Sequence, residues 1–106
     1  MLNHAVFMGR LTADPELKHT SSGKALTSFT VAVNRPGKPG EEAKADFIDC
    51  VAWENTAEFI TKYFCKGKMI VIEGEITSRT REDKEGGKRK YIEVNARAAY
   101  FADAKN

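Results

Sequence analysis

Two large aromatic side chains and a carboxylate share one face of a β-rich stretch, ADFIDCVAW, at residues 45–53. In a strand, side chains alternate between two faces, so Phe47, Asp49, Val51 and Trp53 point one way and Ile48, Cys50 and Ala52 point the other. A core rarely accepts an unpaired carboxylate, so Asp49 indicates that its face is wet. Phe47 and Trp53 then stand about 20 Å apart on an exposed surface, where their rings are free to stack against flat ligands.

A charged segment near the end of the chain bears on the same question, because alternation alone would also fit burial of both rings in a core. Residues 79–90 hold six basic side chains against three acidic ones, a net charge of +3, whereas the whole chain carries +2. The six basic residues are Arg79, Arg81, Lys84, Lys88, Arg89 and Lys90. Outward aromatics beside a basic hairpin form the kind of track that binds the bases and phosphates of a single strand.

Residues that could support catalysis are few and scattered. His4 and His19 are the only histidines, and Cys50 and Cys65 the only cysteines, without Cys-x-x-Cys spacing. A cysteine in an apolar position such as that of Cys50 is inert, and nothing in the spacing pairs either thiol with a histidine. The chain also lacks a P-loop and a Gly-x-Gly-x-x-Gly pattern. We therefore expect no enzyme, no metal site and no cofactor.

The length and composition fit one small domain. The chain has 106 residues, and its 17 basic and 15 acidic side chains give a mild charge that leaves the class of partner open. No secretory signal is visible, and the longest uncharged stretch is too short to span a bilayer. We expect a cytoplasmic protein with both cysteines reduced.

The period of the apolar residues predicts three strands, one helix and two further strands. The expected strands cover 2–12, 24–34, 44–53, 69–79 and 91–101, and the expected helix covers 54–68. Asn55 has the character of an N-cap, with Glu58 three residues on as in a capping box. Two Pro-Gly pairs make 35–44 a surface loop, and 80–90 is expected to be a hairpin tip turning at Gly86 and Gly87.

This order of elements is typical of one architecture. A mostly β, five-stranded Greek-key barrel with a helix between strands three and four is the oligonucleotide/oligosaccharide-binding (OB) fold. In that fold Ile48, Cys50 and Ala52 would fill the barrel. We expect one domain over 1–104, with 105–106 as a short end.

Strings in a fixed order along almost the whole chain carry a family resemblance. They are MLNHAVFMGRLTADPELKHTSSG, FTVAVNR, ADFIDCVAW, AEFITKYFCKG, IEGEITSR and YIEVNA. The set resembles the bacterial single-stranded DNA-binding proteins, and in detail those of low-GC Gram-positive bacteria. No single string is highly specific, whereas the ordered set is.

The resemblance implies an OB fold, no catalysis and sequence-independent binding of single-stranded DNA in replication, recombination and repair. It also implies a cytoplasmic, nucleoid-associated homotetramer with the N-terminal strand between subunits. The interface residues would be Leu2, His4, Val6 and Met8.

Carried over position by position, the resemblance assigns roles to individual residues. Phe47 and Trp53 match stacking positions, whereas two further stacking positions hold Gly37 and Arg81, of which only arginine can still stack. The expected phosphate contacts are Lys18, Arg35, Lys66, Arg79, Lys84, Lys88 and Arg89. Asp49 departs from the basic or amide residue common in relatives, so we expect weaker binding unless a basic neighbour neutralises it.

The chain stops soon after its last strand, without the long tail and acidic tip of the family, so partners recruited by that tip are not expected. A role in the chromosome, in natural transformation or in a phage stays open. The alternatives are a primosome-type OB accessory protein that acts mainly through protein contacts, and an OB module for proteins or oligosaccharides. Phe47 and Trp53 favour DNA binding over the accessory role. The basic hairpin favours DNA binding over the protein- or oligosaccharide-binding module.

Overall fold

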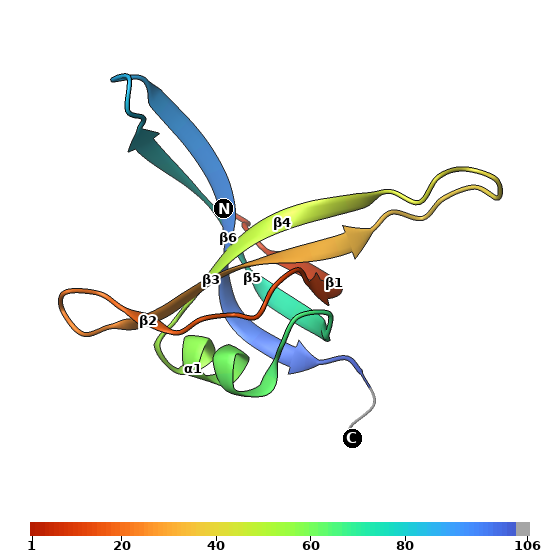
Figure 1. Cartoon of the computed structure of the whole chain (residues 1–106), viewed down its shortest axis with the longest axis horizontal. Helices are drawn as coiled ribbons and strands as arrows, with labels where there is room; N and C mark the ends of the chain where they lie inside the picture. The colour runs from red at the N-terminus through yellow and green to blue at the C-terminus, as the bar shows by residue number, and fades with distance from the viewer. Residues whose placement is uncertain (104–106) are drawn as a thin grey trace.

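The computed structural model describes residues 1–103, and its strands curl into a barrel from which two long hairpins project (Figure 1). The predicted domain end at 104 and the short segment 105–106 lie outside the described residues. The elements are β1 (Ala5–Leu11), β2 (Lys18–His19), β3 (Ala25–Asn34), β4 (Ala45–Trp53), α1 (Glu54–Tyr63), β5 (Met69–Glu82) and β6 (Lys88–Phe101).

The strands form one sheet that closes on itself. Their order is β1-β5-β6-β4-β3-β2, and β1 also pairs with β3, which joins the two sides of the sheet. The pairing of β4 with β6 is parallel and joins Cys50 to Val94, Val51 to Asn95 and Ala52 to Ala96, whereas the other pairings are antiparallel. Apart from the two-residue strand β2, these are the five strands and the helix position of the predicted OB fold.

The barrel interior is filled by Ile48, Cys50 and Ala52 of β4 and by their counterparts on other strands. Cys50 and Ala52 are buried, and Ile48 packs against the core, as predicted. Other core residues come from every long strand and from the helix: Leu11, Phe29, Val31, Ala57, Ile60, Phe64, Ile70, Ile72, Val94 and Ala96. This core fixes which face of each strand is left for solvent.

Helix α1 follows β4 directly and packs against β3, β4 and β6. Ala57 and Ile60 are its buried residues. The predicted cap at Asn55 is wrong, because the helix begins at Glu54 and Trp53 occupies the cap position without a side-chain cap bond. Glu54 instead accepts a hydrogen bond at 2.9 Å from the backbone N–H of Ala25, which joins the helix start to the start of β3.

The hairpin of β5 and β6 is longer than predicted. Its strands continue to Glu82 and resume at Lys88, so the turn is confined to 83–87, where Asp83 accepts hydrogen bonds from the N–H groups of Glu85 and Gly87. The sequence suggested a longer loop because charged residues on both faces hide the strand period. The hairpin leaves the barrel beyond Gly74, so Ile76 and Ile92 are exposed although they continue the inward face.

A bulge marks the root of this hairpin. The register between β5 and β6 shifts between Glu73, opposite Ala98, and Gly74, opposite Ala96. The extra residue reverses the alternation, so that Ala99 rather than Ala98 packs against the core together with Ala96. Gly74 lies so close to β6 that a Cβ there would overlap the carbonyl oxygen of Asn95.

Replacing Gly74 by alanine should therefore destabilise the barrel. We expect Gly74→Ala to lower the free energy of unfolding by about 1–3 kcal/mol, the usual cost of overpacking, in urea denaturation. Gly37→Ala is the matched control, because a Cβ at Gly37 meets no atom within 4 Å. Equal stability of the two variants would contradict the close approach at the bulge.

Candidate nucleic-acid interface

The outward face of β3 and β4 carries the predicted stacking residues in register. Phe47 lies opposite Ala32 and is 68% exposed, which confirms that its ring faces solvent. Trp53 is partly buried and lies opposite Leu26, which in turn pairs with Lys18 of β2. The fold thus places Lys18 in the same cross-strand row as Trp53.

Asp49 lies between the two rings and opposite Thr30. The Thr30 hydroxyl donates a hydrogen bond of 2.9 Å to one carboxylate oxygen. Among the described residues no basic side chain forms an ion pair with Asp49, so the neutralising neighbour that the sequence called for is absent there. Asp49 therefore lies on the face that would meet DNA without a basic partner among these residues.

The hairpin of β5 and β6 supplies the second wall of the site. Arg79 Nε lies 2.7 Å from Glu93 Oε1, so this arginine is held by an ion pair. The guanidinium carbon of Arg81 lies 5.8 Å from the ring centroid of Tyr91, a cation–π contact. Arg89 lies opposite Arg81, so the basic residues extend toward the tip.

Tyr91 is the site residue that sequence analysis missed. Its side chain is 45% exposed and stands opposite Arg79 on the same face of the hairpin. The sequence did indicate that Tyr91 faces outward, because in a strand its side chain alternates onto the opposite face from the core residues Val94 and Ala96. Tyr91 therefore adds an aromatic surface beside Arg81, at the position where the family resemblance had indicated the loss of one.

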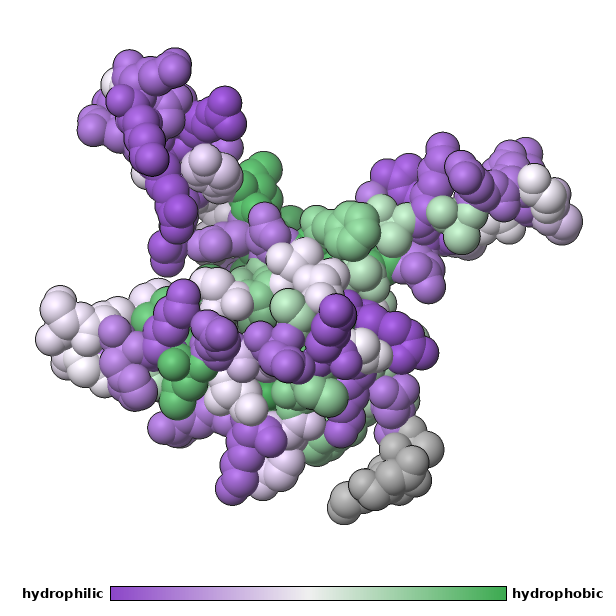
Figure 2. Space-filling model, viewed as in Figure 1, coloured by the Kyte–Doolittle hydropathy of each residue, from purple (hydrophilic) through white to green (hydrophobic). Residues whose placement is uncertain are grey.

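The two walls enclose a cleft of about 320 Å³. Ser28, Thr30 and Asp49 line it from β3 and β4, and Arg79, Arg81, Tyr91 and Glu93 line it from the hairpin. Phe29, Cys50 and Ile92 complete its lining. Figure 2 shows hydrophilic residues over both projecting hairpins and hydrophobic ones nearer their roots. The cleft thus combines carboxylates, guanidinium groups and an aromatic ring.

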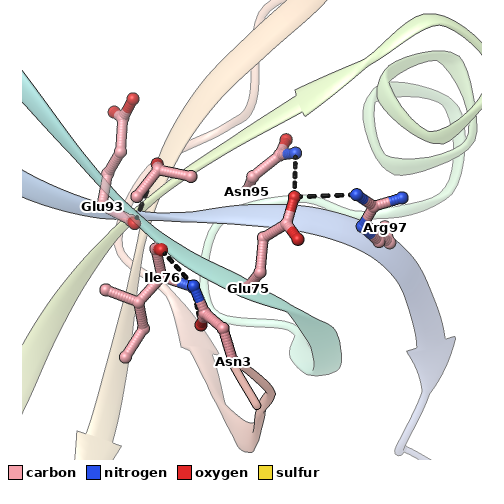
Figure 3. A network of polar contacts seen from close by, with 7 residues as sticks. Asn3, Glu75, Ile76, Glu93, Asn95 and Arg97 are labelled. Atoms are coloured by element: carbon pink, nitrogen blue, oxygen red, sulfur yellow. Dashed lines mark hydrogen bonds and ion pairs between the residues drawn. The ribbon is translucent and has the colours of Figure 1, made fainter. Parts of the chain in front are cut away.

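A polar network holds the root of the β5–β6 hairpin (Figure 3). Glu75 accepts hydrogen bonds from Asn95 at 3.3 Å and from Arg97 at 2.9 Å, and these bonds, Arg97 first, lower the pKa of its carboxyl. The side chain of Asn3 bonds both the N–H and the carbonyl of Ile76. The N-terminal segment and β6 therefore both fix the point where the hairpin leaves the barrel.

Other predicted phosphate contacts lie away from the cleft. Arg35 donates two hydrogen bonds, of 2.7 and 2.9 Å, to Asp46, which alternates onto the opposite face of β4 from Phe47. This pairing raises the pKa of Arg35 and lowers that of Asp46. Lys66 follows α1, where its backbone N–H donates to Asp14 at 2.7 Å. Lys84 lies in the hairpin turn, and Lys88 alternates away from Arg89.

The outer side of β1 is a separate, largely apolar surface. Val6 and Met8 are 58% and 53% exposed, and Leu2 precedes them. His4 Nε2 lies 3.4 Å from a carboxylate oxygen of Glu73, which also accepts a hydrogen bond of 3.0 Å from Tyr100. That bond, with the charge of Glu73, raises the pKa of Tyr100. The predicted interface residues thus lie on one side of the barrel.

A closed barrel with an exposed aromatic face and a basic hairpin is typical of the OB fold, and comparison with known proteins makes the class specific. Residues 2–102 match the sequence model described as the Single-strand binding protein family. The chain belongs to this family, as the resemblance predicted.

Relatives from Gram-positive bacteria match along nearly the whole chain. Single-stranded DNA-binding protein 3 of Listeria innocua is 43% identical over 107 residues, which cover 99% of this chain and 66% of that protein. Single-stranded DNA-binding protein A of Bacillus subtilis is 40% identical over 107 residues, covering 100% and 62%. This chain therefore spans somewhat less than two thirds of the length of these relatives.

The described residues also bear on other kinds of site. Within 1–103, no group of histidine, cysteine or acidic side chains is arranged to hold a metal ion, and no helix is long and apolar enough to cross a membrane. Burial, with smaller contributions from the charges of Asp49 and Glu93, raises the pKa of Cys50 to about 12. A thiol in this state is a poor nucleophile at neutral pH.

Thiol reactivity tests whether Cys50 is buried and unreactive in the native protein. Because the pKa of Cys50 is about 12, only about one ten-thousandth of it is thiolate at pH 8, and the fraction rises as the pH approaches that pKa. An aromatic disulfide reagent at pH 8 should label the exposed Cys65 in the native protein and both thiols in denaturant. Rapid native labelling of a Cys65→Ser variant would contradict the burial of Cys50.

Proposed function

We propose that this protein binds single-stranded DNA without strong dependence on sequence and protects it during replication, recombination and repair. The observation that carries the proposal is the exposed ring of Phe47 on a strand face shared with Trp53 and flanked by a basic hairpin. Membership of the Single-strand binding protein family and the names of the relatives support it.

The geometry suggests how each part contributes. Bases stack on Phe47 and Trp53, and the Arg81–Tyr91 pair offers a third flat surface, each stack worth about 1–3 kcal/mol. Lys18 and Arg89 stand beside these surfaces and contact phosphates. The remaining basic residues would follow the strand as it leaves the site: Arg35, Lys66, Arg79, Lys84 and Lys88. Stacking and phosphate contacts carry little sequence information, so the binding is general.

The role is non-enzymatic and takes place in the cytoplasm, with 1–104 as a single domain. We favour it over a primosome-type accessory protein, because a role confined to protein contacts gives no reason for a ring as exposed as Phe47 beside a basic hairpin. We further propose a homotetramer in which Leu2, His4, Val6 and Met8 lie between subunits. The exposed apolar side chains of β1 support this, since water contact with them is unfavourable.

Removing the ring of Phe47 should weaken DNA binding and leave the fold intact. We expect Phe47→Ala to lose about 1–3 kcal/mol of binding free energy for poly(dT), measured by quenching of Trp53 fluorescence. Because Phe47 is 68% exposed, its unfolding free energy should change by less than about 0.5 kcal/mol.

Phe47→Trp is the matched control, since it keeps a stacking ring and should retain the affinity. Duplex DNA should quench little, and added salt should weaken binding. If Phe47→Ala binds as tightly as the unchanged protein, the ring does not stack and the proposed interface is wrong.

The tetramer predicts a mass four times the 11.8 kDa of the chain by light scattering at micromolar concentration. Met8→Glu places a charge in the proposed interface and should lower the mass, because a buried unpaired charge is costly. Leu17→Glu is the control, as Leu17 is also an exposed apolar residue but lies in the segment between β1 and β2. A monomer in the unchanged protein would contradict the tetramer.

A further inference from the structure

The position of Asp49 in the cleft is unusual for a surface that binds a polyanion. One carboxylate oxygen accepts the Thr30 hydroxyl, and among the described residues the ion-pair partners of Arg79 and Arg35 are other carboxylates. A carboxylate has about four acceptor sites, so most of the capacity of Asp49 is free to accept N–H donors from a ligand.

The neighbours of Asp49 limit what such a ligand could be. Phe47 precedes it by two residues on the same face of β4, roughly 7 Å along the strand. A strand with one base stacked on Phe47 therefore brings the next base within reach of the carboxylate. The cleft volume of about 320 Å³ is at the small end of ligand sites, where a single nucleobase fits better than a larger group.

The opposite wall of the cleft keeps Asp49 available. Arg79 is the nearby cation that could neutralise it, but its Nε lies 2.7 Å from Glu93. Arg81 is turned toward Tyr91, and together they form a flat wall against which a base can lie. The cleft thus offers one planar surface, formed by Arg81 and Tyr91, and one acceptor group, Asp49, without an ionic partner among the described residues.

We propose that Asp49 accepts hydrogen bonds from the Watson–Crick edge of a base in this cleft and gives the protein a preference for guanine. Guanine presents two adjacent donors, N1–H and N2–H, which match the two oxygens of a carboxylate. Thymine presents a single N–H between two carbonyl oxygens that repel the carboxylate. Cytosine and adenine offer one exocyclic amine each, so their affinity should lie between those of guanine and thymine.

This preference rests on the proposed binding of single-stranded DNA and adds to it a dependence on base. It also changes the expected effect of Asp49. The carboxylate still repels phosphates, but its hydrogen bonds to a guanine edge offset part of that loss. Oligothymidylate, which lacks the matching donors, would then be an unfavourable ligand for this chain.

A base-substitution series tests the proposal with the full-length chain. The probes are a fluorescent oligothymidylate and the same strand with isolated thymines replaced by guanine, hypoxanthine or cytosine, in lithium buffer to prevent quadruplexes. We expect guanine to tighten binding about five- to tenfold, the low end for a bidentate contact, because the cleft is open to water. Hypoxanthine has a similar ring surface but no 2-amino group, and should give an intermediate affinity.

Asp49→Asn should remove the preference, since its amide places donors where guanine also has donors. The control is Glu42→Gln, which removes one charge from the exposed β3–β4 loop and should leave the ratio of guanine to thymine affinities unchanged. Equal binding of guanine and thymine strands by the unchanged protein, or a preference that survives Asp49→Asn, overturns the proposal. Failure to bind any of the strands would instead refute the proposed function itself.

Discussion

The parallel pairing of β4 with β6 is the contact on which the rest of this structure depends. It extends over three residue pairs and joins β5 and β6 to β3 and β4 through small side chains such as Cys50, Ala52 and Ala96. On the far side of this contact the two hairpins have no barrel to fill, so they diverge (Figure 1). The outward face of each hairpin then becomes available for a ligand.

The pairing of β4 with β6 also determines which charged residues meet in the site. Because β4 and β6 are neighbours, Asp49 and Glu93 line one cleft with the arginines of β5. The Arg79–Glu93 pair is neutral as a unit, so the long-range attraction for a polyanion comes from the basic residues toward the hairpin tip. In the proposed interface, the rings and Asp49 make the short-range contacts with bases, and hydrogen bonds rather than net charge decide which base Asp49 prefers.

Much of the fold was predictable because it rests on side-chain period. The inward alternation of Ile48, Cys50 and Ala52 and the outward position of Phe47 follow from the sequence. The bulge beside Gly74 could not be predicted, since it arises from the pairing of two strands distant in sequence.

The site was predictable in part, and for similar reasons. The outward position of Phe47 and the basic hairpin follow from local sequence pattern. The ion pairs of Arg35 with Asp46 and of Arg79 with Glu93 depend instead on which strands are neighbours. Tyr91 had the correct alternation, but only the register that places it opposite Arg79 gives it a role. The prediction of a helix cap at Asn55 was wrong because the helix begins at Glu54. The side chain of Glu54 bonds to β3, and this tertiary contact overrides the local capping pattern.

The central claim is that the face shared by β3, β4 and the β5–β6 hairpin binds single-stranded DNA. A structure of the protein with a bound oligonucleotide tests it most directly. We expect one base against Phe47 and another in the cleft between Asp49 and Tyr91. An oligonucleotide bound along α1 or the outer side of β1, with this face empty, would contradict it.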